Sequence, residues 1–117
     1  MLLRVDPGSA VPLFEQLAAS VRFDALNGTI RPGERLPAAR EVAVSLDINV
    51  HTVLRAYQLL REEGLVDLRR GRGAVVTDRV AQYGVLGDAV PLLVAQAKEA
   101  GLGVHVLTAM IRQEYGS

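Results

Sequence analysis

The side chains best suited to bind another molecule through hydrogen bonds lie close together between Asn49 and Arg55. This stretch carries Asn49, His51, Thr52 and Arg55, which offer amide, imidazole, hydroxyl and guanidinium groups. Such groups read the edges of DNA bases and hold phosphate oxygens. Apolar residues recur behind them at helical spacing, so a helix here would bury one face and leave the polar face free. The apolar stripe comprises Val53, Ala56, Tyr57 and Leu60, and we expect Tyr57 in the core rather than stacked on a base.

A basic hairpin is predicted directly after this helix. We expect short strands over Leu65–Arg69 and Ala74–Thr77, joined by a turn in which Gly71 and Gly73 supply the positive φ angles. Arginines at the tip would bind phosphates whatever the base sequence. Side chains alternate between the two faces of a strand, so two adjacent arginines point in opposite directions. One of them can therefore face solvent instead of DNA. The arginines of the tip are Arg69, Arg70 and Arg72.

The composition argues against several other functions. The chain has no cysteine, which excludes disulfides, cysteine-ligated zinc and thiol chemistry. Its two histidines, His51 and His105, have no acidic partners at metal-ligand spacing, so we expect no metal or other cofactor. No nucleophile paired with a base and no phosphate-binding loop is visible, so we do not expect an enzyme. Without a long apolar run or a signal peptide, the protein is expected to be soluble and cytoplasmic.

Basic charge is concentrated in one region of the chain rather than spread over all of it. The 117 residues carry no net charge, whereas strong nucleic-acid binders often have a basic excess. Between Arg22 and Arg79, however, ten arginines face eight acidic residues, and three of those arginines lie within Arg69–Arg72. A single copy should therefore bind DNA weakly, and two copies are expected to act together.

Two further helices are predicted before the polar helix. The first runs roughly over Val11–Asn27 and the second over Ala38–Leu46, whose N-cap position lacks a capping side chain. Asp47 is suited to the left-handed turn that follows, and Asn49 to the N-cap of the third helix. Together with Gly64 as a C-cap and the hairpin, this order predicts a mainly α (α+β) winged helix-turn-helix.

Several of these elements also match a known family in order and spacing. The PGERLP segment, the Arg-Glu-x-Ala of the second helix, the Thr-Val-x-x-Ala-Tyr of the third, and the EEGLV and RGRG elements all lie within residues 28–78. This stretch resembles the winged-helix domain of the GntR family of bacterial transcription regulators. The Asn-x-x-Thr-Val form at Asn49 is similar to the YtrA-type branch of that family.

The resemblance implies specific DNA contacts. Arg40 would hold a phosphate or reach a groove edge, the start of the third helix would read bases, and Arg72 and Gly73 would place the wing tip in the minor groove. Val50 departs from the arginine of many members and cannot make a bidentate guanine contact, so the operator cannot be inferred from a relative. The candidate DNA-binding residues are Arg35, Arg40, Asn49, His51, Thr52, Arg55, Arg69, Arg70, Arg72 and Gly73.

After Asp78 the composition changes, and two more helices are expected over Asp88–Ala100 and Val104–Tyr115. About 40 residues are too few to bury the apolar stripes of these helices by themselves. The simplest partner is the same pair of helices from a second copy, and a short dimerisation tail is also what YtrA-type resemblance implies. Alternatively, the tail folds back on its own winged helix. The candidate dimer-interface residues are Val90, Leu93, Val94, Ala97, Val104, Leu107, Met110 and Ile111.

The sequence thus predicts a winged helix-turn-helix DNA-binding domain over residues 1–78 and a two-helix dimerisation tail over residues 79–117. We expect a homodimeric transcriptional regulator, a repressor that binds double-stranded DNA at an inverted-repeat operator. Two alternatives remain open: a winged helix used for protein contacts without DNA binding, and a regulator switched by a small effector ligand at the dimer interface. The sequence does not identify such an effector.

Overall fold

The computed structural model describes residues 3–116, and the chain divides into two compact units after Val85. The sequence placed this boundary after Asp78. The first unit extends further because the helix α4 (Val80–Gly84) belongs to it: Val80 is 4% exposed, and Tyr83 packs against the same core. Residues 79–85 are therefore part of the winged-helix unit rather than of the tail.

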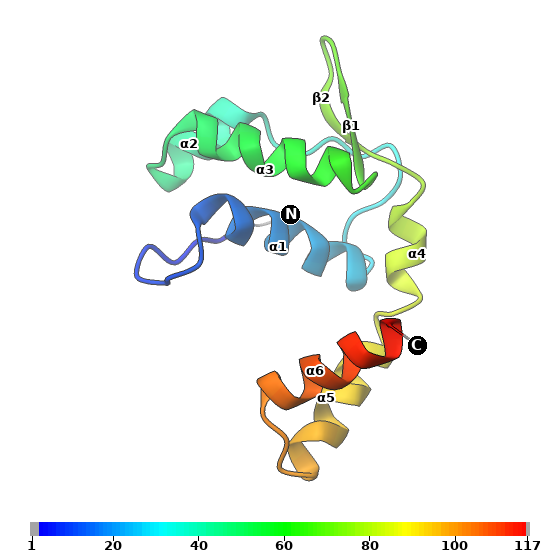
Figure 1. Cartoon of the computed structure of the whole chain (residues 1–117). Helices are drawn as coiled ribbons and strands as arrows, with labels where there is room; N and C mark the ends of the chain where they lie inside the picture. The colour runs from blue at the N-terminus through cyan, green and yellow to red at the C-terminus, as the bar shows by residue number, and fades with distance from the viewer. Residues whose placement is uncertain (1–2, 117) are drawn as a thin grey trace. The chain divides into compact units, whose positions relative to one another are not determined.

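The first unit is a winged helix, which confirms the fold class expected from the sequence. In Figure 1 the helices α1, α2 and α3 pack together, and the β1–β2 ribbon extends away from them. The expected elements are all present, with ends shifted by at most two residues. Their bounds are α1 Leu13–Leu26, α2 Ala39–Leu46, α3 Val50–Glu62, β1 Val66–Arg69 and β2 Gly73–Val76.

The core of this unit lies where α1, α3 and the base of the wing meet. Leu17 and Val21 of α1 pack with Leu60 of α3 and with Leu65, all four at most 1% exposed. Tyr57 is also buried, as expected, and its hydroxyl donates to the Pro37 carbonyl oxygen at 2.5 Å. Burial raises the pKa of the Tyr57 phenol well above its usual range, so it stays neutral as a hydrogen-bond donor.

The turn between α2 and α3 follows local rules. Asp47 adopts φ 53°, and the Ile48 N–H donates to the Ala43 carbonyl oxygen at 3.0 Å, which closes the end of α2. The side chain of Asn49 caps α3, whereas Ala38 provides no side-chain cap for α2. These are the backbone positions that the sequence predicted for a helix-turn-helix.

The wing makes a backbone contact that the sequence did not indicate. Strands β1 and β2 pair antiparallel with Val66 opposite Val76 and Arg69 opposite Gly73. The segment before α2 adds a bridge in which Arg35 lies opposite Val75. This bridge is flanked by the Leu36 N–H, which donates to the Ala74 carbonyl oxygen at 2.9 Å. One edge of β2 is thereby covered, which stiffens the ribbon.

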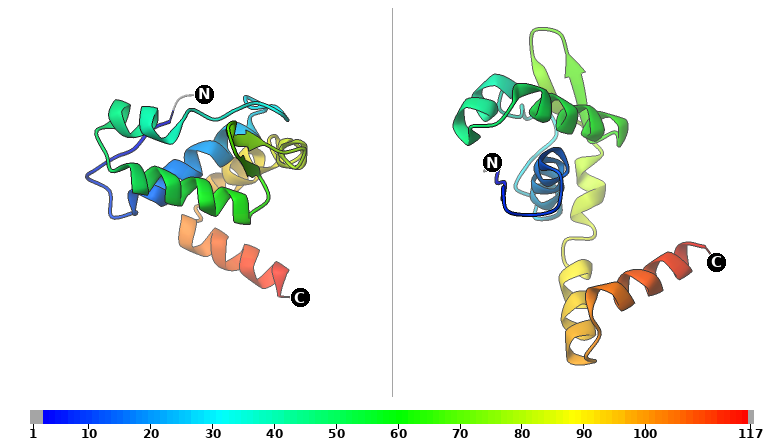
Figure 2. Two further views of the ribbon diagram at one scale, coloured as in Figure 1. Left: turned by 90° about the horizontal axis from the view of Figure 1, so that it is seen from above. Right: turned by 60° about the vertical axis from the view of Figure 1, so that its left-hand side comes forward.

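The second unit is a pair of helices, α5 (Ala89–Glu99) and α6 (Val104–Tyr115), joined by a turn at Gly101 with φ 76°. Figure 2 shows the two helices leaving this turn in diverging directions. In α5 only Ala97 is buried, and α6 has no buried residue. Most of the apolar surface predicted to form an interface is therefore open.

Candidate nucleic-acid interface

The N-terminus of α3 presents polar groups that remain available for hydrogen bonds to a ligand. The Asn49 Oδ1 accepts a hydrogen bond from the His51 backbone N–H at 2.8 Å, so the carbonyl side of this amide is used for capping. Its NH2 group keeps two donors for an outside acceptor such as N7 of adenine or a phosphate oxygen. His51 is exposed and Thr52 half-buried. The residues predicted to read bases therefore lie together at the first turn of α3.

Arg55, one turn further along, is held in place by an aromatic ring. Its guanidinium carbon lies 3.8 Å from the ring centroid of Phe14 on α1, a cation–π contact. The flat face of the group is covered, while its N–H edges have no hydrogen bond or ion pair among the described residues. Phe14 is partly buried against the core, and no pattern in the sequence indicated that it contacts Arg55. The guanidinium group of Arg55 is thus oriented by a contact within the protein itself.

Removal of Arg55 should reduce sequence-specific binding. We expect Arg55→Ala to weaken binding to the preferred site by about 1–3 kcal/mol and to relax specificity, because an oriented guanidinium group is lost. Fluorescence anisotropy on the preferred and a scrambled duplex measures both effects. Arg61→Ala, an exposed arginine in the last turn of the same helix, is the matched control and should leave both affinities unchanged. Equal losses on both duplexes would assign Arg55 to phosphate binding instead.

Helix α2 contributes a cation beside an open groove. Arg40 is exposed and lines a groove of about 490 Å³ together with Val44, Asp47 and Val50. No hydrogen bond or ion pair holds the Arg40 side chain within the part of the chain that the structure describes. It is therefore free to bind a phosphate next to whatever enters the groove.

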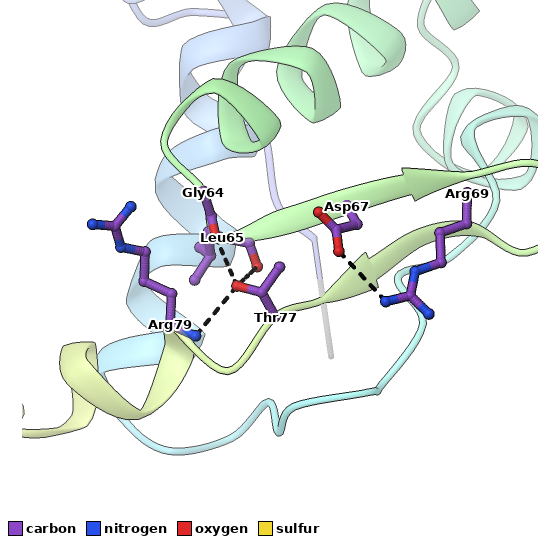
Figure 3. A network of polar contacts seen from close by, with 6 residues as sticks. All are labelled: Gly64, Leu65, Asp67, Arg69, Thr77 and Arg79. Atoms are coloured by element: carbon purple, nitrogen blue, oxygen red, sulfur yellow. Dashed lines mark hydrogen bonds and ion pairs between the residues drawn. The ribbon is translucent and has the colours of Figure 1, made fainter.

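The arginines of the wing are not equivalent. Arg69 forms an ion pair with Asp67, with 3.5 Å between Nη2 and Oδ2 (Figure 3). Both side chains are more than half exposed, so this pair is weak and can exchange for a phosphate. Arg70 and Arg72 are exposed at the tip beside Gly73, without a described ion pair. Arg35 is exposed beside β2, where its backbone is fixed by the bridge to Val75.

The base of the wing is fastened to the end of α3. The Thr77 hydroxyl contacts the carbonyl oxygens of Gly64 at 2.6 Å and Leu65 at 3.2 Å, and the Arg79 backbone N–H donates back to it at 3.3 Å (Figure 3). Gly64 has φ 79°, and a Cβ there would lie 2.6 Å from the Arg79 guanidinium group. These contacts fix the direction in which the wing leaves α3. The sequence showed no sign of the Thr77 contact.

The wing arginine Arg72 should contribute affinity without specificity. We expect Arg72→Ala to weaken binding to all duplexes by a similar factor and to reduce the slope of log K against log salt by about one, since one phosphate contact is lost. A salt titration of the anisotropy signal on specific and scrambled DNA measures this slope. If Arg72→Ala alters the preference between duplexes and leaves the slope intact, the side chain reads bases.

Comparison with known proteins agrees with this geometry. Residues 4–76, more than half of the chain, match the family described as bacterial regulatory proteins, gntR family. The chain belongs to the GntR family. It is 31% identical over 104 residues to the HTH-type transcriptional repressor YtrA of Bacillus subtilis, a match that covers 89% of this chain and 79% of that protein. The expected YtrA-type resemblance is confirmed.

Two solved structures extend the comparison. YtrA from Sulfolobus acidocaldarius, described as a GntR-family transcription factor, superposes with a TM-score of 0.62 at 27% identity, covering 85% of this chain and 99% of that one. The DNA-binding domain of AraR in complex with operator ORX1 superposes with a TM-score of 0.56 at 25% identity, covering 64% and 93%. This GntR protein is accordingly a DNA-binding transcriptional regulator and not an enzyme. No helix in the described part of the chain is long and apolar enough to cross a membrane.

Proposed function

We propose that this GntR protein is a homodimeric repressor that binds an inverted-repeat operator. The observation that carries the proposal is the open apolar surface of α5 and α6. Val90, Leu93, Met110 and Ile111 are between 38% and 51% exposed, although these helices are otherwise regular. Contiguous apolar surface of this kind marks an interaction site.

A second copy of the chain is the simplest partner for this surface. The second unit begins at Leu86, and a unit of about 30 residues cannot by itself build a core that keeps it folded. Pairing α5 and α6 with their counterparts would bury both stripes at once and complete a core shared by the two chains. Two-fold pairing also makes each interface self-complementary, as is usual for homodimers.

A two-fold dimer would also explain why the operator is proposed to be an inverted repeat. Two-fold symmetry would present two copies of α3 to half-sites about 34 Å apart, one helical turn of DNA, in inverted orientation. Arg40 and the wing arginines would bind phosphates, while Asn49, His51, Thr52 and Arg55 would read bases. Repression is supported by the B. subtilis relative, which is itself described as a repressor. We propose that it acts by occlusion of the promoter, in the cytoplasm.

Three measurements test the proposal. Selection of bound DNA from a random pool should yield two half-sites in inverted orientation with a fixed spacing, and light scattering after size exclusion should give twice the 12.6 kDa chain mass. Transcription from a promoter that overlaps the selected site should fall when the protein is added. A direct repeat, a single half-site or a monomeric mass would contradict the proposal.

A further inference from the structure

The DNA-facing side of the helix-turn-helix carries apolar residues that the contacts above do not use. Leu54 is 48% exposed on α3 and Val44 is 82% exposed on α2. Val50, half-buried at the start of α3, lines the 490 Å³ groove together with Val44. We call Val44, Val50 and Leu54 the apolar strip.

The three residues of the strip are neighbours. Val50 and Leu54 are four residues apart on α3, so their side chains lie next to one another on one face of the helix. Val44 and Val50, on either side of the turn, line the same groove. Leu54 is also three residues from His51, which places the strip beside the predicted base-reading groups. Arg40 lines the groove as well and supplies a phosphate-binding group at its side.

The major groove of DNA offers one apolar feature to such a strip, the C5-methyl group of thymine. Single exposed apolar residues are ordinary on a protein surface. The apolar strip, however, lies on the surface proposed to contact DNA, and most groups of DNA are polar. It gains free energy there only where methyl groups project. Val50 has no hydrogen-bonding group for guanine but offers an apolar surface to a methyl group.

We propose that Leu54, with Val50 and Val44 beside it, is a specificity-determining residue that recognises thymine methyl groups in each half-site. This inference rests on the proposed operator recognition and deepens it. Burial of one methyl group corresponds to about a fourfold change in Kd. With one methyl group read in each half-site of a dimer, the two contributions multiply to about 15-fold.

Deoxyuridine supplies a matched test, because it removes the methyl group of thymine and keeps base pairing and the O4 acceptor. The duplex obtained by selection is remade with each thymine replaced by deoxyuridine in turn, and Kd is measured by anisotropy with the full chain. For the unmodified protein we expect a loss of about fourfold at one or two positions of a half-site and none elsewhere. Leu54→Ala should bind the thymine duplex about as weakly as the unmodified protein binds the deoxyuridine duplex, and should no longer distinguish the two.

Phe23→Ala is the control variant. Phe23 is also an exposed apolar side chain, at 63%, but it lies on α1 away from the helix-turn-helix. This variant should keep the full preference for thymine. Circular dichroism of both variants checks that they fold.

The possible failures can be told apart. If the protein binds no selected DNA, the proposed operator recognition itself fails. If it binds a selected operator but tolerates deoxyuridine at every position, the strip does not face methyl groups, and the proposal is overturned while operator recognition stands. A preference for thymine that persists in Leu54→Ala and in Val44→Ala would assign methyl recognition to other residues and would equally overturn it.

Discussion

Leu93→Asp is expected to yield a monomer whose affinity for the full operator is about 10²–10⁴-fold lower, because the second half-site is then no longer bound within one complex. Leu93 is 41% exposed on α5, so an aspartate there does not disturb the winged-helix core. It would, however, place an unpaired charge in the proposed dimer interface, which strongly disfavours association. Affinity for an isolated half-site should stay unchanged. Sedimentation velocity gives the mass, and anisotropy on full and half-site duplexes gives both affinities.

Gln96→Asp is the matched control for this change. It introduces the same aspartate on the same helix at an exposed polar position outside the predicted stripe. It should leave the dimer and the operator affinity intact. If Leu93→Asp also remains a dimer with full affinity, the two copies associate through another surface, and the assignment of α5 and α6 is wrong.

Leu60→Ala is expected to lower the free energy of unfolding of the winged-helix unit by about 2–5 kcal/mol. The Leu60 side chain is fully buried, where α3 packs on α1 beside Leu17 and Val21. Its removal leaves a cavity that the surrounding helices cannot fill completely. Urea unfolding followed by circular dichroism measures the loss through the transition midpoint.

The same substitution at an exposed position of α3 controls for helix propensity. Leu54→Ala removes the same atoms from a side chain that is 48% exposed, so it should change stability by less than about 1 kcal/mol. A comparable loss of stability in both variants would mean that α3 is stabilised by helix propensity rather than by packing in the core. The pair of variants also separates folding from DNA recognition, since of the two leucines only Leu54 belongs to the apolar strip proposed to contact DNA.

The sequence by itself determined the features that follow from local rules. The 3.6-residue spacing of Val53, Ala56, Tyr57 and Leu60 predicted the buried face of α3, and all four are buried. The left-handed conformation of Asp47 and the N-cap role of Asn49 predicted where the turn of the helix-turn-helix lies. Each depends on residues a few positions apart, whose conformational preferences act whatever surrounds them. For the same reason the apolar stripes of α5 and α6 could be read directly, while their role in dimerisation stays a prediction.

Only the tertiary structure decided which distant groups meet. The stacking of Arg55 on Phe14, the bridge from Arg35 to Val75 and the contact of Thr77 with Gly64 each join residues far apart in sequence. The ion pair between Arg22 and Glu63 is another such contact; its hydrogen bond raises the pKa of Arg22. No periodic pattern encodes these pairs, since they depend on how whole elements pack rather than on the preference of one residue. The 48% exposure of Leu54 also came only from the structure, because the spacing placed this residue outside the buried stripe without showing how far neighbouring elements cover it.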